Sequence, residues 1–400
     1  MYQMLEGLTV IEASSFVASP SAGLYLAQMG TEVIRIDQIG GGPDFGRWPR
    51  ADNGASLYWE NLNRAKKSVA IDMTRPEGRA LVQALAASTG QFLTNFPVDG
   101  FLSHAQLAQT RADLITVRIM GQADGGPALD YTVNAAVGIP QLTGPASLGD
   151  SPVNHVLPAW DLLTGAYAAF AMMTALHHRG SSGAGREIRI PLADVAIASV
   201  ANLGMIAEVA ATGQDRERLG NTVYGAFGRD FVTADGKRLM IMAITPRQWR
   251  GLVTVLGIAA EIAGIEARHG VSFDSDEGLR YVHRAELFGL VENRVAHWQH
   301  DALVAAMTAN GCCFGGYQTL REACTDPALV TANPIFSTAA GNPSGLAYAA
   351  AGAFAAIPAE PRAPARPAPR LGADTDSVLE RLLGMSPVAI GALHDQRLIA

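Results

Sequence analysis

The feature that most constrains the fold is the alternation of short β-branched runs with helical patterns over the first 120 residues. This alternation is typical of βαβ units, which build a parallel sheet covered by helices on both faces. We therefore predict an α/β fold. The expected strands cover residues 9–12, 32–37, 68–72, 92–95 and 114–119.

Helix boundary signals agree with this alternation. Ser19 followed by Pro20 predicts the start of a helix, and Gly30 predicts its end. Thr74 and Glu77 have the spacing of a capping box, which predicts a helix toward residue 88.

The second half of the chain changes character beyond Gly220. Before it, apolar and small residues predict a buried helix over 161–178, a strand at 188–190 and a helix over 191–211. After it, the Asp235-Gly236 turn between two strand-like runs, 229–232 and 237–244, predicts a hairpin that opens a smaller α+β unit. Helices at 246–256, 277–307 and 376–383 and a proline-rich extended connector over 357–369 complete the prediction.

Composition limits the partners and the compartment. A net charge of −7 argues against nucleic acid, because the summed field repels phosphate backbones. The longest uncharged stretch, 327–359, is interrupted by proline and glycine, which argues against a membrane span. Three cysteines without a CxxC pair indicate a reducing compartment, and the first residues do not resemble a signal peptide. We therefore expect a cytoplasmic protein.

Several familiar sites are excluded by their motifs. The turn after the first strand, SSFVASP, lacks the G-x-G-x-x-G of a dinucleotide site, so Asp37 is interpreted as a structural residue at a strand end. The glycines at 40–42 are not followed by Gly-Lys-Ser/Thr, so no P-loop is predicted. No G-x-S-x-G elbow occurs, and the nine histidines lack metal-ligand spacing, so we expect no metal.

A basic cluster and one aspartate carry the remaining chemistry. Five basic residues face two acidic ones between residues 47 and 67, which fits either a solvated loop or a site for a nucleotide phosphate. The cluster consists of Arg47, Arg50, Arg64, Lys66 and Lys67. Asp161, just before the apolar helix, fits either a helix cap or a carboxylate kept ionised and nucleophilic by the positive end of the helix. His155 is the histidine closest to it in sequence.

These segments, in this order, resemble the family III CoA-transferases over nearly the whole chain. The matching stretches are GLTVIEASSFVASPSAGLYLAQMGTEVIRID, NLNRAKKSVAIDM, LTNF, LDYTVNAAVG, the Asp161 segment and APRLGADTDSVLERLLG. The resemblance is greatest to the branch that moves CoA between the two carboxyls of one unsaturated branched dicarboxylate, through DYTVNAAVGIPQLTG, VNHVLPAWDLLTG, NLGMIAEV and GNTVYGAFGRDF.

The resemblance implies a fold and an assembly. It implies a large Rossmann-like domain with a parallel sheet built from both chain ends, a smaller middle domain, and an interlocked homodimer. The expected boundaries are 1–215 for the first part of the large domain, 220–330 for the small α+β domain and 331–400 for the return segment and the rest of the large domain.

The resemblance also implies site residues. Asp161 matches the catalytic aspartate, and Tyr131 matches an active-site tyrosine. The residues that match CoA contacts are Val17 and Ala18 in the turn after the first strand, Lys66 and Lys67 near the adenine nucleotide, and Asn95 and Phe96 at the pantetheine. Arg47 and His155 are candidates for holding the second carboxylate.

Two departures narrow the chemistry. The racemase branch has a histidine shortly before the tyrosine, where this chain has Gly126 to Asp130 without one. The oxalate-type transferases have a run of four glycines in the middle region, where this chain has only isolated glycines over 220–231. The expected reaction is intramolecular CoA transfer through an aspartyl-CoA thioester, with no cofactor beyond the CoA of the substrate. Intermolecular transfer, racemisation and a non-enzymatic CoA-binding role with Asp161 as a cap remain alternatives.

Overall fold

A computed structural model describes residues 1–400, which divide into two compact units. Unit 1 comprises Met1–Val137, His155–Gly213 and Thr325–Ala400, and unit 2 comprises Gly138–Asn154 and Gln214–Cys324. The predicted boundaries put 138–154 in the large domain. These residues belong to unit 2 instead, where Arg218 donates hydrogen bonds to the carbonyls of Gln141 and Pro140 at 2.7 and 3.4 Å.

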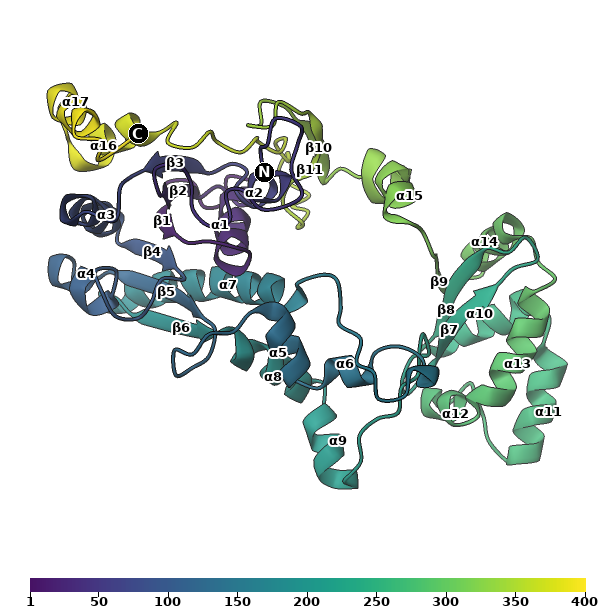
Figure 1. The fold of residues 1–400 in the computed structure, drawn as a ribbon. Helices are drawn as coiled ribbons and strands as arrows, with labels where there is room; N and C mark the ends of the chain where they lie inside the picture. The colour runs from purple at the N-terminus through teal and green to yellow at the C-terminus, as the bar shows by residue number, and fades with distance from the viewer. The chain divides into compact units, whose positions relative to one another are not determined.

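Unit 1 is built on a six-stranded parallel sheet in the order β3-β2-β1-β4-β5-β6 (Figure 1). Its strands are β1 (Thr9–Ala13), β2 (Glu32–Asp37), β3 (Lys67–Ala70), β4 (Gln91–Thr94), β5 (Ile115–Met120) and β6 (Glu187–Pro191). Successive side chains of a strand point to opposite faces, so each strand supplies two cores. The predicted α/β class with a parallel sheet is confirmed.

Each face of the sheet is covered by helices. Val10 and Val33 pack in a buried cluster with α1 (Ala18–Gln28) and α7 (Ala159–Ser182). Their neighbours Ile11 and Ile34 pack in a second cluster on the opposite face. That cluster includes residues of α3 (Pro76–Thr89), α4 (His104–Thr110), α16 (Thr375–Leu383) and α17 (Pro387–Asp395).

A glycine sets the approach of α7 to α1. A Cβ at Gly165 would lie 2.1 Å from Ser21 Oγ and 2.7 Å from the Ala18 carbonyl oxygen, so only glycine fits without a shift. The two helices therefore lie in close contact near their first turns. Asp161, one turn before Gly165, is thereby held near the residues that follow β1.

The chain returns to unit 1 through its last residues. β10 (Phe336–Ala339) and β11 (Tyr348–Ala351) form an antiparallel pair, and 352–370 carries no helix or strand. Ile399 then forms a bridge with Ile71 beside β3. The remaining helices of unit 1 include α2 (Leu57–Leu62), α5 (Asp130–Ala136), α8 (Leu192–Asn202) and α9 (Met205–Thr212), and a π-helix covers Pro327–Thr331.

The predicted helix over 191–211 is wrong in one respect, because it is broken. Gly204 has φ +77°, which α-helix does not allow, and α8 and α9 meet at 62°. No single helix has the length and apolar composition needed to cross a membrane, although this bent pair meets that criterion when taken together.

Unit 2 contains a three-stranded antiparallel sheet in the order β7-β8-β9 with helices packed against it. Phe227, Phe231, Trp249 and Phe288 form its buried aromatic centre. The predicted hairpin is confirmed as β7 (Phe227–Val232) and β8 (Arg238–Ala243). The other elements are α6 (Ile139–Leu142), a 3₁₀ turn (Ala146–Leu148), α10 (Pro246–Leu256), α11 (Ala259–His269), α12 (Glu277–Val282), α13 (Arg284–Val295), α14 (His300–Ala309), β9 (Cys313–Gly316) and α15 (Leu320–Thr325), whose last residue belongs to unit 1.

Two predicted helix caps are wrong. α1 begins after Val17, so Ser19 lies inside the helix rather than at its cap. α3 begins after Arg75, because the Thr74 hydroxyl donates to Asp72 Oδ1 at 2.6 Å. The turn before α1 is set by contacts with distant residues, Asp44 and Asn95, whereas the turn before α3 is set by the local contact of Thr74 with Asp72.

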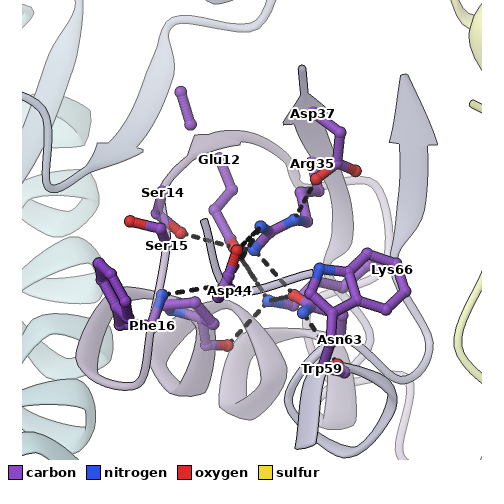
Figure 2. A network of polar contacts seen from close by, with 12 residues as sticks. Glu12, Ser14, Ser15, Phe16, Arg35, Asp37, Asp44, Trp59, Asn63 and Lys66 are labelled. Carbon is purple, nitrogen blue, oxygen red and sulfur yellow. Dashed lines mark hydrogen bonds and ion pairs between the residues drawn. The ribbon is translucent and has the colours of Figure 1, made fainter. Parts of the chain in front are cut away.

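Buried charges join the first three strands of unit 1 (Figure 2). Arg35 on β2 contacts Glu12 on β1 at 3.4 Å, Asp37 at 2.7 Å and Asp44 at 3.4 Å. Lys66 lies 2.8 Å from Glu12. Buried charges are tolerated only when they are paired and hydrogen-bonded. The structural interpretation of Asp37 is confirmed, since it accepts from Arg35 and from the Ser68 hydroxyl.

Lys66 is part of this network rather than a free cation. Its side chain is 0% exposed, and its ammonium also donates to the Pro20 carbonyl at 2.8 Å and to Asn63 Oδ1 at 2.9 Å. These contacts use all three N–H groups. Lys67, in contrast, is partly exposed and pairs with Glu32 at 2.8 Å.

These neighbouring lysines should differ sharply in their effect on stability. Lys66→Ala removes the closer of the two cations that contact buried Glu12 and leaves only Arg35 at 3.4 Å, so we expect it to lower the free energy of unfolding by about 3–5 kcal/mol. Lys67→Ala removes a surface pair and should cost less than about 1 kcal/mol. Urea unfolding of both variants measures the difference, and equal costs would contradict the assignment of Lys66 to the network.

Candidate active site

The first turn of α7 positions Asp161. The residue preceding the helix, Pro158, offers no side-chain cap, and Asp161 is the third residue of the helix, so it is not the cap itself. Its backbone N–H donates to Asp130 Oδ2 at 3.0 Å. Its carboxylate has no hydrogen bond or ion pair with another side chain in the described chain of 400 residues. The helix start thus presents an unpaired carboxylate.

Four residues around Asp161 form a connected cluster. Asp130, buried at the start of α5, contacts His155 Nε2 through Oδ1 at 2.6 Å while its other oxygen accepts from Asp161. The His155 ring lies between two aromatic rings, with centroids 5.8 Å from Tyr131 and 6.3 Å from Trp160. The structure therefore brings the predicted residues Tyr131, His155 and Asp161 together. Sequence reasoning missed Asp130.

The charge state of Asp161 differs from the expectation. Burial raises its pKa from 3.8 to about 7, and the neighbouring Asp130 carboxylate raises it further, while Arg47 opposes the shift. The positive end of α7, which the sequence offers as one reason for an ionised carboxylate, does not offset the effect of burial. Above pH 7 the carboxylate is ionised but poorly solvated, which is the state of a reactive nucleophile.

Arg47 lies on the loop after β2 and is exposed toward this site. Its Cζ lies 5.4 Å from the centroid of the Phe16 ring and 5.1 Å from that of Tyr58. Burial raises the pKa of Tyr58 to about 12, and the charges of Arg47 and Asp161 also act on this hydroxyl. Tyr58 is therefore a further polar group of the site. No motif in the sequence singled it out.

The turn after β1 completes this side. Val17 precedes α1 and Ala18 is its first residue, and no side chain caps their N–H groups. Asn95, at the end of the neighbouring β4, accepts from the Ser15 N–H at 3.2 Å and donates to the Ser15 carbonyl at 2.9 Å. Its amide is thus already used on the turn, so Asn95 supports the turn rather than offering free donors to a ligand.

Two cavities lie at the carboxyl ends of the strands. One of about 410 Å³ is lined by Ser14, Ser15, Gln38, Thr74, Arg79 and Phe96, among others. Another of about 890 Å³ is lined from Asn95 and Phe96 to Leu129, the residue before Asp130. Phe96 lines both. The crevice at this edge of a parallel α/β sheet is where such folds bind ligands.

The predicted lysine pair lies elsewhere. Lys66 and Lys67 precede and begin β3, at the amino ends of the strands, and they line a separate cavity of about 660 Å³. The assignment of Lys66 as a nucleotide contact is wrong, because its ammonium is buried and fully bonded. Arg79, missed in the sequence, is exposed at the carboxyl-end cavity, with its Cζ 5.2 Å from the centroid of the Phe101 ring. No group of three or more His, Cys, Asp or Glu that could hold a metal ion occurs in the chain.

The raised pKa of Asp161 makes a prediction about stability. The folded protein holds a proton on Asp161 up to about pH 7, whereas the unfolded chain loses it near 3.8, so ionisation of this group destabilises the fold as the pH rises through this window. Asp161→Asn removes that cost. We expect the variant to be more stable than the natural protein at pH 8, by about 2–4 kcal/mol, with the gap closing at pH 4.

The measurement is thermal or urea unfolding across this pH range, with Asp113→Asn as control. The Arg111 guanidinium holds the pKa of the Asp113 carboxyl below its usual value, so removing that charge should bring no gain at pH 8. A gap for Asp161→Asn that is the same at pH 4 and pH 8 would show that the carboxyl is solvated normally.

Comparisons with known proteins identify the family. A 2-methylfumaryl-CoA isomerase of Chloroflexus aurantiacus is 43% identical, covering 100% of this chain and 98% of that protein. A succinate–glutarate CoA-transferase of Agrobacterium fabrum is 31% identical over 81% and 82% of the two chains. A CAIB/BAIF family protein from Brucella suis has a similar structure, with a TM-score of 0.76, 25% identity and coverage of 96% and 100%. Residues 5–375 match the model of CoA-transferase family III, and the chain belongs to that family.

Proposed function

We propose that this enzyme moves CoA between the C1 and C4 carboxyls of an unsaturated branched dicarboxylate, 2-methylfumaryl-CoA (mesaconyl-CoA). The transfer passes through a thioester between CoA and Asp161. The proposal is supported by the full-length similarity to a protein named for this isomerisation. The observation that carries it is the unpaired, half-buried Asp161 carboxylate at the start of α7.

The cycle begins with attack of an Asp161 carboxylate oxygen on the thioester carbonyl. The C–S bond breaks, CoA leaves as a thiolate, and Asp161 and the substrate acyl group form a mixed anhydride. The thiolate then attacks the Asp161 carbonyl carbon, which releases the free dicarboxylate and leaves an aspartyl-CoA thioester. This is covalent catalysis, which splits one difficult exchange into easier steps.

The second half reverses the first at the other end of the substrate. The C4 carboxylate attacks the aspartyl thioester, thiolate leaves again, and a new anhydride forms. Thiolate attack on the C4 carbonyl gives the regioisomeric thioester and restores the Asp161 carboxylate. Because the dicarboxylate and CoA stay bound, no second bimolecular encounter is needed. No resident cofactor enters this cycle.

The environment of Asp161 favours the covalent state. Burial and the nearby Asp130 carboxylate destabilise the ionised form of Asp161. Forming the anhydride or the thioester replaces that charge with a neutral carbonyl, so the unfavourable interaction is relieved when the covalent bond forms. The interactions of the free enzyme thus push the reaction toward the enzyme-bound intermediate.

The remaining predicted residues have roles in binding. We assign the nucleotide end of CoA to the cavity lined by Gln38 and Arg79, and the pantetheine to a path from Phe96 toward Val17 and Ala18 at the start of α1. Arg47, whose charge acts on Asp161, is one group that we assign to the second carboxylate. Tyr131 and His155, whose rings are in contact, are the others.

Intermolecular transfer to a second acid is the alternative, because a relative 31% identical is named as a succinate–glutarate CoA-transferase. It would use the same Asp161. Racemisation finds less support, because the stretch from Gly126 to Asp130 lacks the histidine that the racemase branch has shortly before its tyrosine.

One incubation separates these functions. Purified enzyme is given a single 2-methylfumaryl-CoA regioisomer in D₂O, together with ¹³C-labelled free 2-methylfumarate. We expect the other regioisomer to form without ¹³C or carbon-bound deuterium, and no conversion by Asp161→Ala. Labelled thioester would instead indicate intermolecular transfer, and deuterium on carbon would indicate proton abstraction. Conversion by the alanine variant would refute the covalent role of Asp161.

We also propose a cytoplasmic homodimer. α7 exposes a stripe of large apolar side chains at helical spacing, Leu163, Tyr167 and Phe170, the last 63% exposed. A contiguous exposed apolar face is typical of a surface that pairs with another chain. Light scattering should give twice the mass of one chain. A monomeric mass at micromolar concentration would contradict the pairing, and Phe170→Glu should weaken it.

A further inference from the structure

The turn between β1 and α1 has an unusual backbone. Phe16 has φ +70°, in the left-handed region that glycine normally occupies, yet a bulky aromatic residue stands there. This conformation costs about 1 kcal/mol or more for such a residue and persists only where the surroundings hold it. What holds it therefore determines where Val17 and Ala18 lie.

Two side chains from outside the turn hold it, Asp44 and Asn95, and Figure 2 shows the contact of Asp44. Asp44, on the loop after β2, accepts the Phe16 N–H through Oδ2 at 3.0 Å. Asn95 grips both the N–H and the carbonyl of Ser15. The N–H groups of Ser15 and Phe16 and the Ser15 carbonyl thus bond to side chains and not to a strand or a helix.

Asp44 is itself fixed. It is 1% exposed, and both of its oxygens lie 3.4 Å from Arg35 Nη2. Three residues further along the same loop, Arg47 lies over the Phe16 ring. Asp44 thus links the buried network to two parts of the candidate site, the turn before α1 and the arginine beside Asp161.

We propose that Asp44 is a positioning residue for the CoA transfer. Arg35 fixes the Asp44 carboxylate, which accepts the Phe16 N–H. Asp44 thereby keeps the start of α1 and Arg47 at the positions relative to Asp161 that the reaction requires. Asp44 touches no reacting atom. The inference rests on the proposed function, because it assumes that the reaction takes place at Asp161, beside the start of α1 and Arg47.

Asp37 supplies a matched control. It is also a buried carboxylate, 2% exposed, and its contact with the same Arg35 is shorter, 2.7 Å. It makes no contact with the turn, since its other partner is the Ser68 hydroxyl. If Asp44 only stabilised the fold through Arg35, loss of either carboxylate would have similar consequences for catalysis.

The test compares Asp44→Ala with Asp37→Ala, using regioisomer conversion at a temperature where circular dichroism shows both variants folded. We expect kcat to fall 10- to 100-fold more for Asp44→Ala than for Asp37→Ala, with a smaller change in KM. Displacement of a group in the active site by about 1 Å has effects of this size. Asp44→Asn retains an acceptor for the Phe16 N–H and should recover most of the loss. Equal losses of kcat in the two alanine variants, or no recovery in Asp44→Asn, would overturn the proposal.

Hydrogen exchange gives a readout that does not depend on the reaction. The peptide containing Phe16 should exchange at least 10-fold faster in Asp44→Ala but not in Asp37→Ala. A turn that loosens without a loss of kcat would overturn the positioning role. Should Asp44→Ala fail to fold, Asn95→Ala loosens the same turn outside the ion network and must show the same pattern of kcat loss and faster exchange. Asp161→Ala runs alongside, and its continued turnover would show that the proposed function has failed rather than the role of Asp44 alone.

Discussion

The candidate site depends on one buried ion pair between neighbouring strands. Glu12 of β1 and Arg35 of β2 are register partners in the sheet, and both are almost completely buried. An unpaired charge buried this deeply would lower the free energy of unfolding by several kcal/mol. Each of the two residues therefore requires the other to stay in position. The remaining donors and acceptors of the pair recruit Lys66 from the start of β3 and Asp44 from the loop after β2. The network thereby reaches from the centre of the sheet to the loops at its carboxyl edge.

A network of this kind contributes position more than net stability. Replacing buried ion pairs with apolar residues is often neutral in free energy, whereas breaking one partner is costly. The network includes two cations, Arg35 and Lys66, and three carboxylates, Glu12, Asp37 and Asp44. The network places hydrogen-bond acceptors at defined positions, as Asp44 does for the Phe16 N–H. It thereby fixes the strained turn and the loop that carries the exposed Arg47.

Asp161 differs from the carboxylates of the network, because no cation pairs with it. Its carboxylate is half-buried and unpaired, and a second carboxylate lies close by, which raises its pKa to about 7. The fold is less stable for keeping it, and that cost disappears when the carboxylate becomes an acyl group. The carboxylates Glu12, Asp37 and Asp44 are all paired with cations, whereas Asp161 has no such partner, which is consistent with selection for reactivity at this position.

The sequence predicted much of this fold, because the strand pattern is local. β2 and α10 begin and end where their apolar and capping residues predicted. The failures have non-local causes. Ser19 is not the cap of α1, because Asp44 and Asn95 set the turn one step earlier. The helix over 277–307 is divided into three, and α17 was not foreseen.

The site was predicted in part. Tyr131, His155 and Asp161 lie together. Lys66, expected near the adenine nucleotide, is instead buried at the amino edge of the sheet with its ammonium bonded to protein groups. The sequence held one further signal, for the buried ion pair. A glutamate in one buried strand and an arginine in the neighbouring strand predict an ion pair, and Glu12 and Arg35 form such a pair. Asp130 carried no such signal, since its importance depends on packing between α5 and α7.

The central claim is that the Asp161 carboxyl carries CoA during turnover, and trapping with hydroxylamine tests it most directly. Enzyme converting a 2-methylfumaryl-CoA regioisomer is treated with hydroxylamine, digested and analysed by mass spectrometry. We expect a hydroxamate on Asp161 that forms only when substrate is present and that is absent when Asp161 is replaced by asparagine. An unmodified Asp161 peptide recovered from enzyme that is turning over would contradict it.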